Sequence, residues 1–97
     1  MVVEIIRLNI EKESLEKFQS AFQEVGGFLQ RSEHCLSFEV LNGVEEPNHF
    51  IIKSEWDSLE GHQAFETGPD AKDFFALVEP FFPAILEKKH YNYIAKA

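Results

Sequence analysis

The N-terminal segment carries apolar side chains on both faces of a predicted β-strand. Over residues 2–10, Val3 and Ile5 point to one side of an extended chain, while Ile6 and Leu8 point to the other. Such a strand requires cover on both faces, because an apolar side chain contributes stability only when it leaves water. We therefore expect this strand to lie between two layers.

A helix and a hairpin follow this strand. Ser14 can cap the helix, whose apolar residues recur at three- and four-residue steps as far as about residue 31. Strands are predicted over 35–41 and 48–56, because apolar and polar side chains alternate there and turn residues separate the two segments.

The second half of the chain is rich in phenylalanine and ends in a further strand. Asp57 and Glu60 form a predicted capping box for a short helix, which the Gly-Pro pair at 68–69 ends. An aromatic helix follows and stops at Pro83, after which residues 88–95 are predicted as the last strand.

This order of elements predicts an α+β fold of ferredoxin-like topology. Its four-stranded antiparallel sheet would carry all the helices on one face. The other face then needs a second layer, and the simplest one is a second copy of the chain packed sheet to sheet. We expect a homodimer that forms a dimeric α/β barrel.

The chain is short, acidic and poor in cysteine. Its 97 residues, 44% of them hydrophobic, suffice for one core, so we expect a single domain over residues 1–97. The formal net charge of -8 disfavours nucleic acid and anionic membranes as partners. No apolar run approaches the roughly 20 residues that span a bilayer. Without a signal-peptide pattern, we expect a cytoplasmic protein.

The sequence lacks the spacing of a metal or nucleotide site. Its four histidines show no HxH or HExxH pattern, and no Gly-rich phosphate loop, GxSxG or CxxC motif is present. The histidines are His34, His49, His62 and His90. We expect no metal and no cofactor.

Several segments resemble the antibiotic biosynthesis monooxygenase domain family. They are the stretches 34–41 and 48–58, Phe18 in the first helix, and the Gly-Pro break at 68–69. The resemblance covers almost the whole chain and implies a dimeric α/β barrel. It also implies oxidation of a small quinol- or anthrone-like aromatic substrate by molecular oxygen, without metal, flavin or haem.

The chain departs from the family pattern at polar positions. A histidine that many quinol-monooxygenase-like members carry aligns with Phe65, and a glutamate before the hairpin tryptophan aligns with Ser54. The residues of the haem-degrading branch align with Ile6, Phe65 and Phe75, which disfavours haem degradation.

His62 is the candidate catalytic residue. Leu59, His62 and Phe65 share one side of the short helix, which we expect to face the sheet, and a neutral imidazole could take a phenolic proton. The structural alternative is a partly buried histidine that only bonds a backbone carbonyl. For the aromatic candidates a core position is the favoured alternative, and for Asn9 a surface turn is at least as favoured. The candidate substrate-binding residues are Asn9, Trp56, Phe65, Phe74 and Phe75.

Three functions remain open at this point. The first is the cofactor-independent monooxygenase that the resemblance implies. The second is a non-catalytic ligand-binding or assembly module of the same fold, which the missing polar residues favour. The third is an isomerase or lyase for a small carbonyl compound, which would use the same histidine and consume no oxygen.

Overall fold

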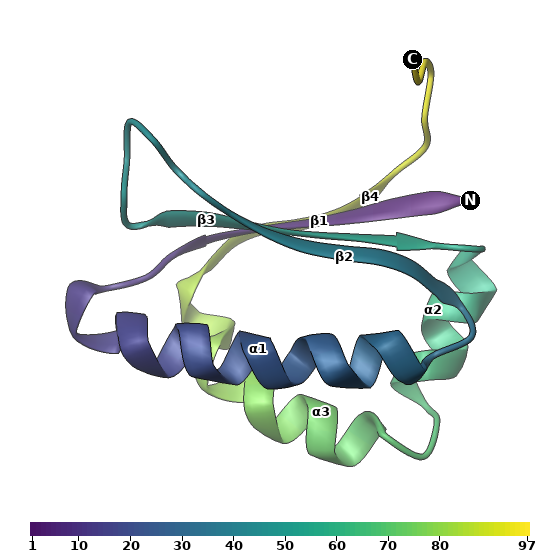
Figure 1. Ribbon diagram of the computed structural model, residues 1–97, viewed down its shortest axis with the longest axis horizontal. Helices are drawn as coiled ribbons and strands as arrows, with labels where there is room; N and C mark the ends of the chain where they lie inside the picture. Colours follow the sequence, from purple (N-terminus) through teal and green to yellow (C-terminus); the bar gives the residue numbers. More distant parts are fainter.

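Four antiparallel strands form one sheet in the order β2-β3-β1-β4 (Figure 1). The computed structural model describes all 97 residues. The strands are β1 (Val2–Asn9), β2 (Cys35–Asn42), β3 (His49–Trp56) and β4 (Ile85–Tyr91). The two strands with the most buried side chains, β1 and β3, occupy the centre, where both edges of each strand are hydrogen-bonded.

All the helices lie on one side of the sheet (Figure 1). They are α1 (Leu15–Arg31), α2 (Leu59–Glu66) and α3 (Ala71–Val78), with 3₁₀ turns η1 (Lys12–Ser14) and η2 (Glu79–Ala84). The predicted α+β, ferredoxin-like topology is therefore confirmed. None of these helices is both long enough and apolar enough to cross a bilayer.

Two predicted helix caps differ in detail. Ser14 stands at the start of α1, but its side chain makes no capping bond, because the preceding 3₁₀ turn already satisfies the local backbone. In α2 the cap is Ser58 instead of Asp57: its hydroxyl oxygen accepts the Gly61 N–H at 2.9 Å. The Asp57 side chain pairs with His34 instead.

The last strand begins and ends earlier than the predicted segment 88–95. The 3₁₀ turn that contains Pro83 finishes at Ala84, so the chain is free to extend from Ile85. The strand ends at Tyr91, which pairs with Val3 near the start of β1. Beyond that point β1 offers almost no backbone partners.

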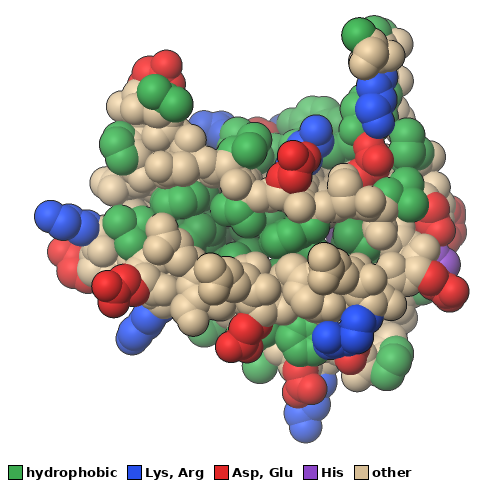
Figure 2. Space-filling view, in the orientation of Figure 1, with side chains coloured by type: hydrophobic (Ala, Val, Ile, Leu, Met, Phe, Trp, Pro, Cys, Tyr) green, Lys and Arg blue, Asp and Glu red, His purple; other side chains and the backbone are tan.

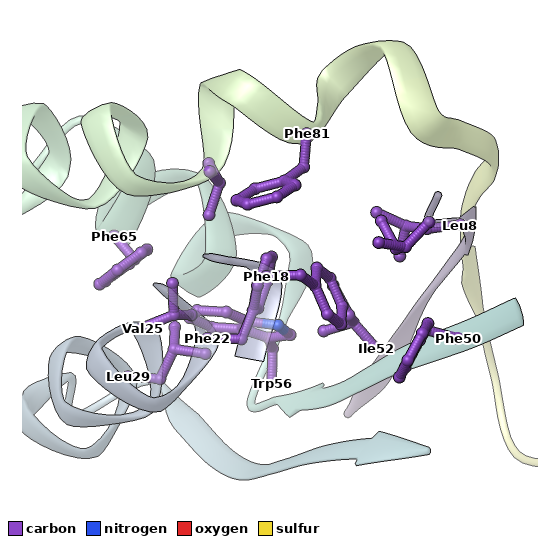
Figure 3. Close-up of a cluster of buried hydrophobic side chains, with 12 residues drawn as sticks. Leu8, Phe18, Phe22, Val25, Leu29, Phe50, Ile52, Trp56, Phe65 and Phe81 are labelled. Atoms are coloured by element: carbon purple, nitrogen blue, oxygen red, sulfur yellow. The ribbon is translucent and has the colours of Figure 1, made fainter. Parts of the chain in front are cut away.

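The core lies between the helices and the sheet (Figure 3). Phe18 of α1 is its centre: its ring lies 4.7 Å from the rings of Phe22 and Phe50 and 5.5 Å from that of Phe81, measured between centroids. Each fully buried side chain of this size contributes about 1.5–3 kcal/mol. The predicted apolar stripe of α1 is thus the layer that covers one face of the sheet.

The opposite face of the sheet has no covering layer within the chain. The register places Ile5 of β1, Ile51 of β3 and Leu41 of β2 on this face, together with several charged side chains. The β2–β3 hairpin and the C-terminal tail both rise on this side (Figures 1 and 2). Val44 in the hairpin and Ile94 in the tail are 89% and 98% exposed. Such surface favours a protein partner.

We predict that this open face joins two copies of the chain. Light scattering at micromolar concentration should give twice the mass of one chain, and Ile51→Asp should give a monomer because it places a charge at the centre of the interface. Leu59→Asp, at an exposed leucine on α2, is the matched control and should remain dimeric. A monomeric mass for the unchanged protein would contradict the prediction.

A hydrogen-bonded pair ties the start of β2 to the end of β3. His34 Nδ1 lies 2.8 Å from Asp57 Oδ2, and the Asp57 backbone N–H donates to the His34 carbonyl oxygen at 3.0 Å. The hydrogen bond to Asp57 raises the pKa of His34, and the same bond lowers the pKa of Asp57. The pair also holds the chain at the entry to α2.

This pair should make stability depend on pH in a defined window. The contribution of His34 is complete below its unfolded pKa of about 6.5 and is lost as pH rises through the raised folded value. That of Asp57 is complete above its unfolded pKa of about 4 and is lost as pH falls through the lowered folded value. Chemical denaturation should therefore separate the unchanged protein from His34→Gln more at about pH 5.5 than at about pH 8.5. The same separation at both pH values would contradict the assignment. In an Asp57→Asn background, His34→Gln should give equal separations at the two pH values, because the partner of His34 is then uncharged.

Candidate functional site

A pocket lies between the sheet and the helices, and most of its wall is apolar. It has a volume of about 70 Å³, and 14 of its 19 lining residues are hydrophobic, so it favours an apolar occupant. The aromatic residues of the wall come from α1, β2, β3, α3 and η2 and are Phe22, Phe38, Trp56, Phe74, Phe75, Phe81 and Phe82. The polar lining residues are Glu4, Ser54, His62, Glu66 and Lys88.

The pocket is small for an aromatic ring in this conformation. An engineered apolar cavity of about 150 Å³ is enough to bind benzene, roughly twice the volume here. Phe82 is exposed, while Phe74 and Phe75 are only partly buried. A flat substrate that entered between α3 and the sheet would have to move these phenylalanines outward.

Trp56 is fixed by a hydrogen bond and by stacking. Its side chain is fully buried, and its indole N–H donates to Ser54 Oγ at 2.9 Å. The imidazole of His62 stacks on the indole with 4.3 Å between ring centroids. Ser54 is therefore the hydrogen-bond acceptor that Trp56 needs when buried.

His62 lies at the polar end of the pocket and is 6% exposed. Its Nδ1 is 2.9 Å from Nε2 of His90, so one ring donates a hydrogen and the other accepts it. Burial lowers the pKa of His62, and the nearby His90 and Lys88 act in the same direction against Glu66. The imidazole is thus neutral at neutral pH and has a lone pair that can accept a proton.

The carboxyl of Glu4 lies beside the His62 and His90 rings and forms with them a group of three titratable side chains. The carboxyl is only 5% exposed, and its Oε2 makes no hydrogen bond. Oε2 lies 3.6 Å from His90 Nε2, 3.7 Å from His62 Nε2 and 4.0 Å from Lys88 Nζ. Burial raises the pKa of Glu4 to about 7, although Lys88 pulls it down. A carboxyl of this kind exchanges its proton near neutral pH.

The sheet register brings these residues together. Glu4 of β1 stands directly opposite His90 of β4 on one side and Ser54 of β3 on the other. Helix α2 begins at the Ser58 cap, and its first turn carries His62 over the same point. Three segments that are distant in sequence therefore meet at one end of the pocket.

Neither Glu4 nor His90 was predicted as a site residue from the sequence. One signal was available for Glu4, because the alternation of β1 places it on the same inward face as Ile6 and Leu8. An acidic residue in such an apolar series is rarely buried without a role. No comparable signal in the sequence marks His90. It lies on the edge strand β4, and its ring contacts His62, which is distant in the sequence.

The predicted site residues occupy different places. Trp56, His62, Phe74 and Phe75 line the pocket together. Phe65 lies behind this wall, 5.5 Å from Trp56 and 4.9 Å from Phe74 between ring centroids.

Asn9 and Leu59 lie in other places than the sequence predicted. Asn9 is exposed at the far end of β1, beside Pro83 and Ala84, and does not line the pocket. Leu59 points to solvent instead of toward the sheet, because the buried side of α2 consists of Gly61, His62 and Phe65.

Glu4, His62 and His90 could together hold a metal ion. One ligand atom each from Glu4, His62 and His90 lie within 4.8 Å of one another. The expectation of no metal site was based on histidine spacing along the sequence, and the fold produces a ligand set that this spacing does not reveal.

The bond between Trp56 and Ser54 can be tested through stability. Ser54→Ala leaves a buried indole N–H without an acceptor, which should lower the free energy of unfolding by about 1–3 kcal/mol. Chemical denaturation followed by Trp56 fluorescence measures this, because Trp56 is the only tryptophan. Ser20→Ala, at an exposed position of α1, is the control and should change stability little. Equal stability of Ser54→Ala and the unchanged protein would contradict the role.

The fold and sequence are similar to those of known proteins. The family model described as antibiotic biosynthesis monooxygenase matches residues 1–77. The uncharacterised protein YczJ of Bacillus subtilis is 22% identical over 93 residues, which cover 95% of this chain and 98% of YczJ.

Solved structures extend the similarity to the whole fold. A candidate antibiotic biosynthesis monooxygenase from Bordetella bronchiseptica has a TM-score of 0.82 at 16% identity over 97% of each chain. SnoaB of Streptomyces nogalater, described as a cofactor-independent oxygenase, has a TM-score of 0.82 at 14% identity over 98% of this chain and 94% of SnoaB. These structures support the fold, and the family match covers well over half of the sequence. The chain belongs to the antibiotic biosynthesis monooxygenase family.

Proposed function

We propose that this protein is a monooxygenase that oxidises a small hydroxylated aromatic compound with molecular oxygen. The observation that carries the proposal is a buried, neutral His62 at the polar end of a pocket whose remaining wall is aromatic and aliphatic. Family membership and the fold shared with SnoaB, a cofactor-independent oxygenase, support it.

The lining of the pocket suits both reactants. Once the phenylalanines of α3 move outward, a flat ring can lie against Trp56, Phe74 and Phe75, with its hydroxyl group toward His62. Molecular oxygen is apolar and partitions into the same space in preference to water. A quinol- or anthrone-like compound fits this division into an apolar ring and one polar end.

His62 is proposed to start the reaction by accepting the substrate's hydroxyl proton. The imidazolium that forms lies 3.7 Å from Glu4 Oε2 and 4.0 Å from Glu66 Oε2, measured from Nε2, so negative charge can stabilise it. The contact with His90, whose side chain is 32% exposed, gives the proton a route to solvent. Positioned proton transfer of this kind contributes about 10²–10⁴-fold in rate.

The electron balance of the proposed reaction needs no further reductant. The deprotonated ring is electron-rich and transfers an electron to oxygen, and the two radicals combine into a peroxide on a ring carbon. The O–O bond then breaks: one oxygen atom stays on carbon and the other leaves as water. The substrate supplies all four electrons, so a quinol becomes a hydroxyquinone. On this proposal the protein requires no cofactor for the oxidation.

Oxygen consumption tests the proposal directly. An oxygen electrode with a panel of quinols, naphthols and anthrones should record uptake by the unchanged protein without any additive. His62→Gln should reduce the rate by about 10²-fold or more, because it removes the proton acceptor. His49→Gln is the matched control, since His49 is paired with Glu46 at the opposite end of β3 and should leave the rate unchanged.

Other outcomes separate the alternatives. Quenching of Trp56 fluorescence by a ligand, with no oxygen uptake for any compound, would favour a binding module. Turnover of a carbonyl compound at the same rate in the absence of oxygen would favour an isomerase or lyase. Oxygen uptake that is equal in the unchanged protein and in His62→Gln would remove the role proposed for His62.

A further inference from the structure

We propose that Glu4, His62 and His90 form a binding site for one divalent transition-metal ion of the Zn²⁺ class. The three side chains come from β1, α2 and β4 and converge beneath the polar end of the pocket. This inference concerns binding alone and does not rest on the proposed oxidation.

The separations between the Glu4 carboxyl and the two imidazoles fit a metal ion better than hydrogen bonds. Zn²⁺ binds imidazole nitrogen and carboxylate oxygen at about 2.1 Å, so two ligands of a tetrahedral ion lie about 3.4 Å apart. Oε2 of Glu4 is 3.6 Å from His90 Nε2 and 3.7 Å from His62 Nε2. Both separations are too long for hydrogen bonds, and each is within a few tenths of an ångström of the ligand spacing.

The Glu4 carboxyl provides an independent reason to expect an occupant. It is almost fully buried, it points toward the two imidazoles, and its Oε2 has no hydrogen-bond partner. A buried polar atom left in this state costs about 1–3 kcal/mol, more when it is charged. A bound cation would satisfy this oxygen and one nitrogen of each histidine, in exchange for the 2.9 Å hydrogen bond between His62 Nδ1 and His90 Nε2.

The donor set selects the kind of ion. Two imidazoles and one carboxylate suit Zn²⁺ and neighbouring first-row ions, whereas Mg²⁺ and Ca²⁺ require more oxygen ligands. Three protein ligands leave a fourth position for water or a substrate atom, and His62 and Glu4 both line the pocket. The open position would therefore face the pocket.

Of the charged side chains around the site, one favours the binding of a cation and one opposes it. Glu66 Oε2 lies 4.0 Å from His62 Nε2 and favours a cation, while Lys88 Nζ lies 4.0 Å from Glu4 Oε2 and opposes one. The Lys88 side chain is half exposed, so it can turn into solvent when an ion enters. Lys88→Gln should accordingly bind the ion more tightly than the unchanged protein.

The metal site and the proposed proton transfer use the same lone pair of His62. An ion bound there would keep His62 from accepting a substrate proton, so one protein molecule can do only one of the two at a time. This one consequence rests on the proposed function: the metal-bound form should be inactive in the oxidation.

Titration with Zn²⁺ tests the site in tag-free protein that has been treated with chelator. Calorimetry should give one ion per chain, and binding should weaken at least about tenfold in both Glu4→Gln and His90→Gln. His49→Gln removes a partly buried histidine that also has a glutamate partner, and it should bind like the unchanged protein. Co²⁺ should give a visible absorption band of the bound ion that both ligand variants lose.

The outcomes are distinct from those of the oxidation assay, because no substrate or turnover is involved. His90 lies near the surface of the edge strand, so His90→Gln should fold normally, and circular dichroism checks this. Stoichiometric binding that is lost in His90→Gln supports the site. Absence of saturable binding, or equal binding by the unchanged protein and His90→Gln, would overturn it.

Discussion

The packing of α1 against the inward face of β1 and β3 is the interaction on which the rest of the structure depends. Phe18 contacts the rings of Phe22, Phe50 and Phe81, and through them it joins the first helix, a central strand and the last turn before β4. Removal of this cluster from water is the dominant favourable term for a domain of this size. Once it forms, the register of the central strands is determined.

The same strand register also positions the titratable side chains at the end of the pocket. The inward face that carries Ile6 and Leu8 to the core carries Glu4 to the end of the sheet, next to His90 and below His62. The pocket lies between this face of the sheet and the helices, and α1, α2 and α3 all contribute side chains to its wall. A polar group of three titratable side chains at the end of an apolar pocket is a common arrangement for a functional site.

Much of the fold could be predicted because its signals are local. Alternation identified β1, β2 and β3, and the stripe of α1 identified the helix to its last residue. The errors lie where local signals compete. Both Asp57 and Ser58 can cap a helix, and the pairing of Asp57 with His34 decides for Ser58. The bounds of β4 depend on where β1 ends, which no residue of β4 itself records.

The sequence by itself determined the order and type of the elements, the helix-covered face of the sheet, and the aromatic character of the pocket wall. These follow from periodicity and from the free energy of burying apolar side chains. Only the tertiary structure decided that Glu4, His62 and His90 meet, that Asn9 lies outside the pocket and that Ser54 supports Trp56. Contacts between distant segments depend on strand register and helix placement, and spacing along a single chain carries no direct record of either.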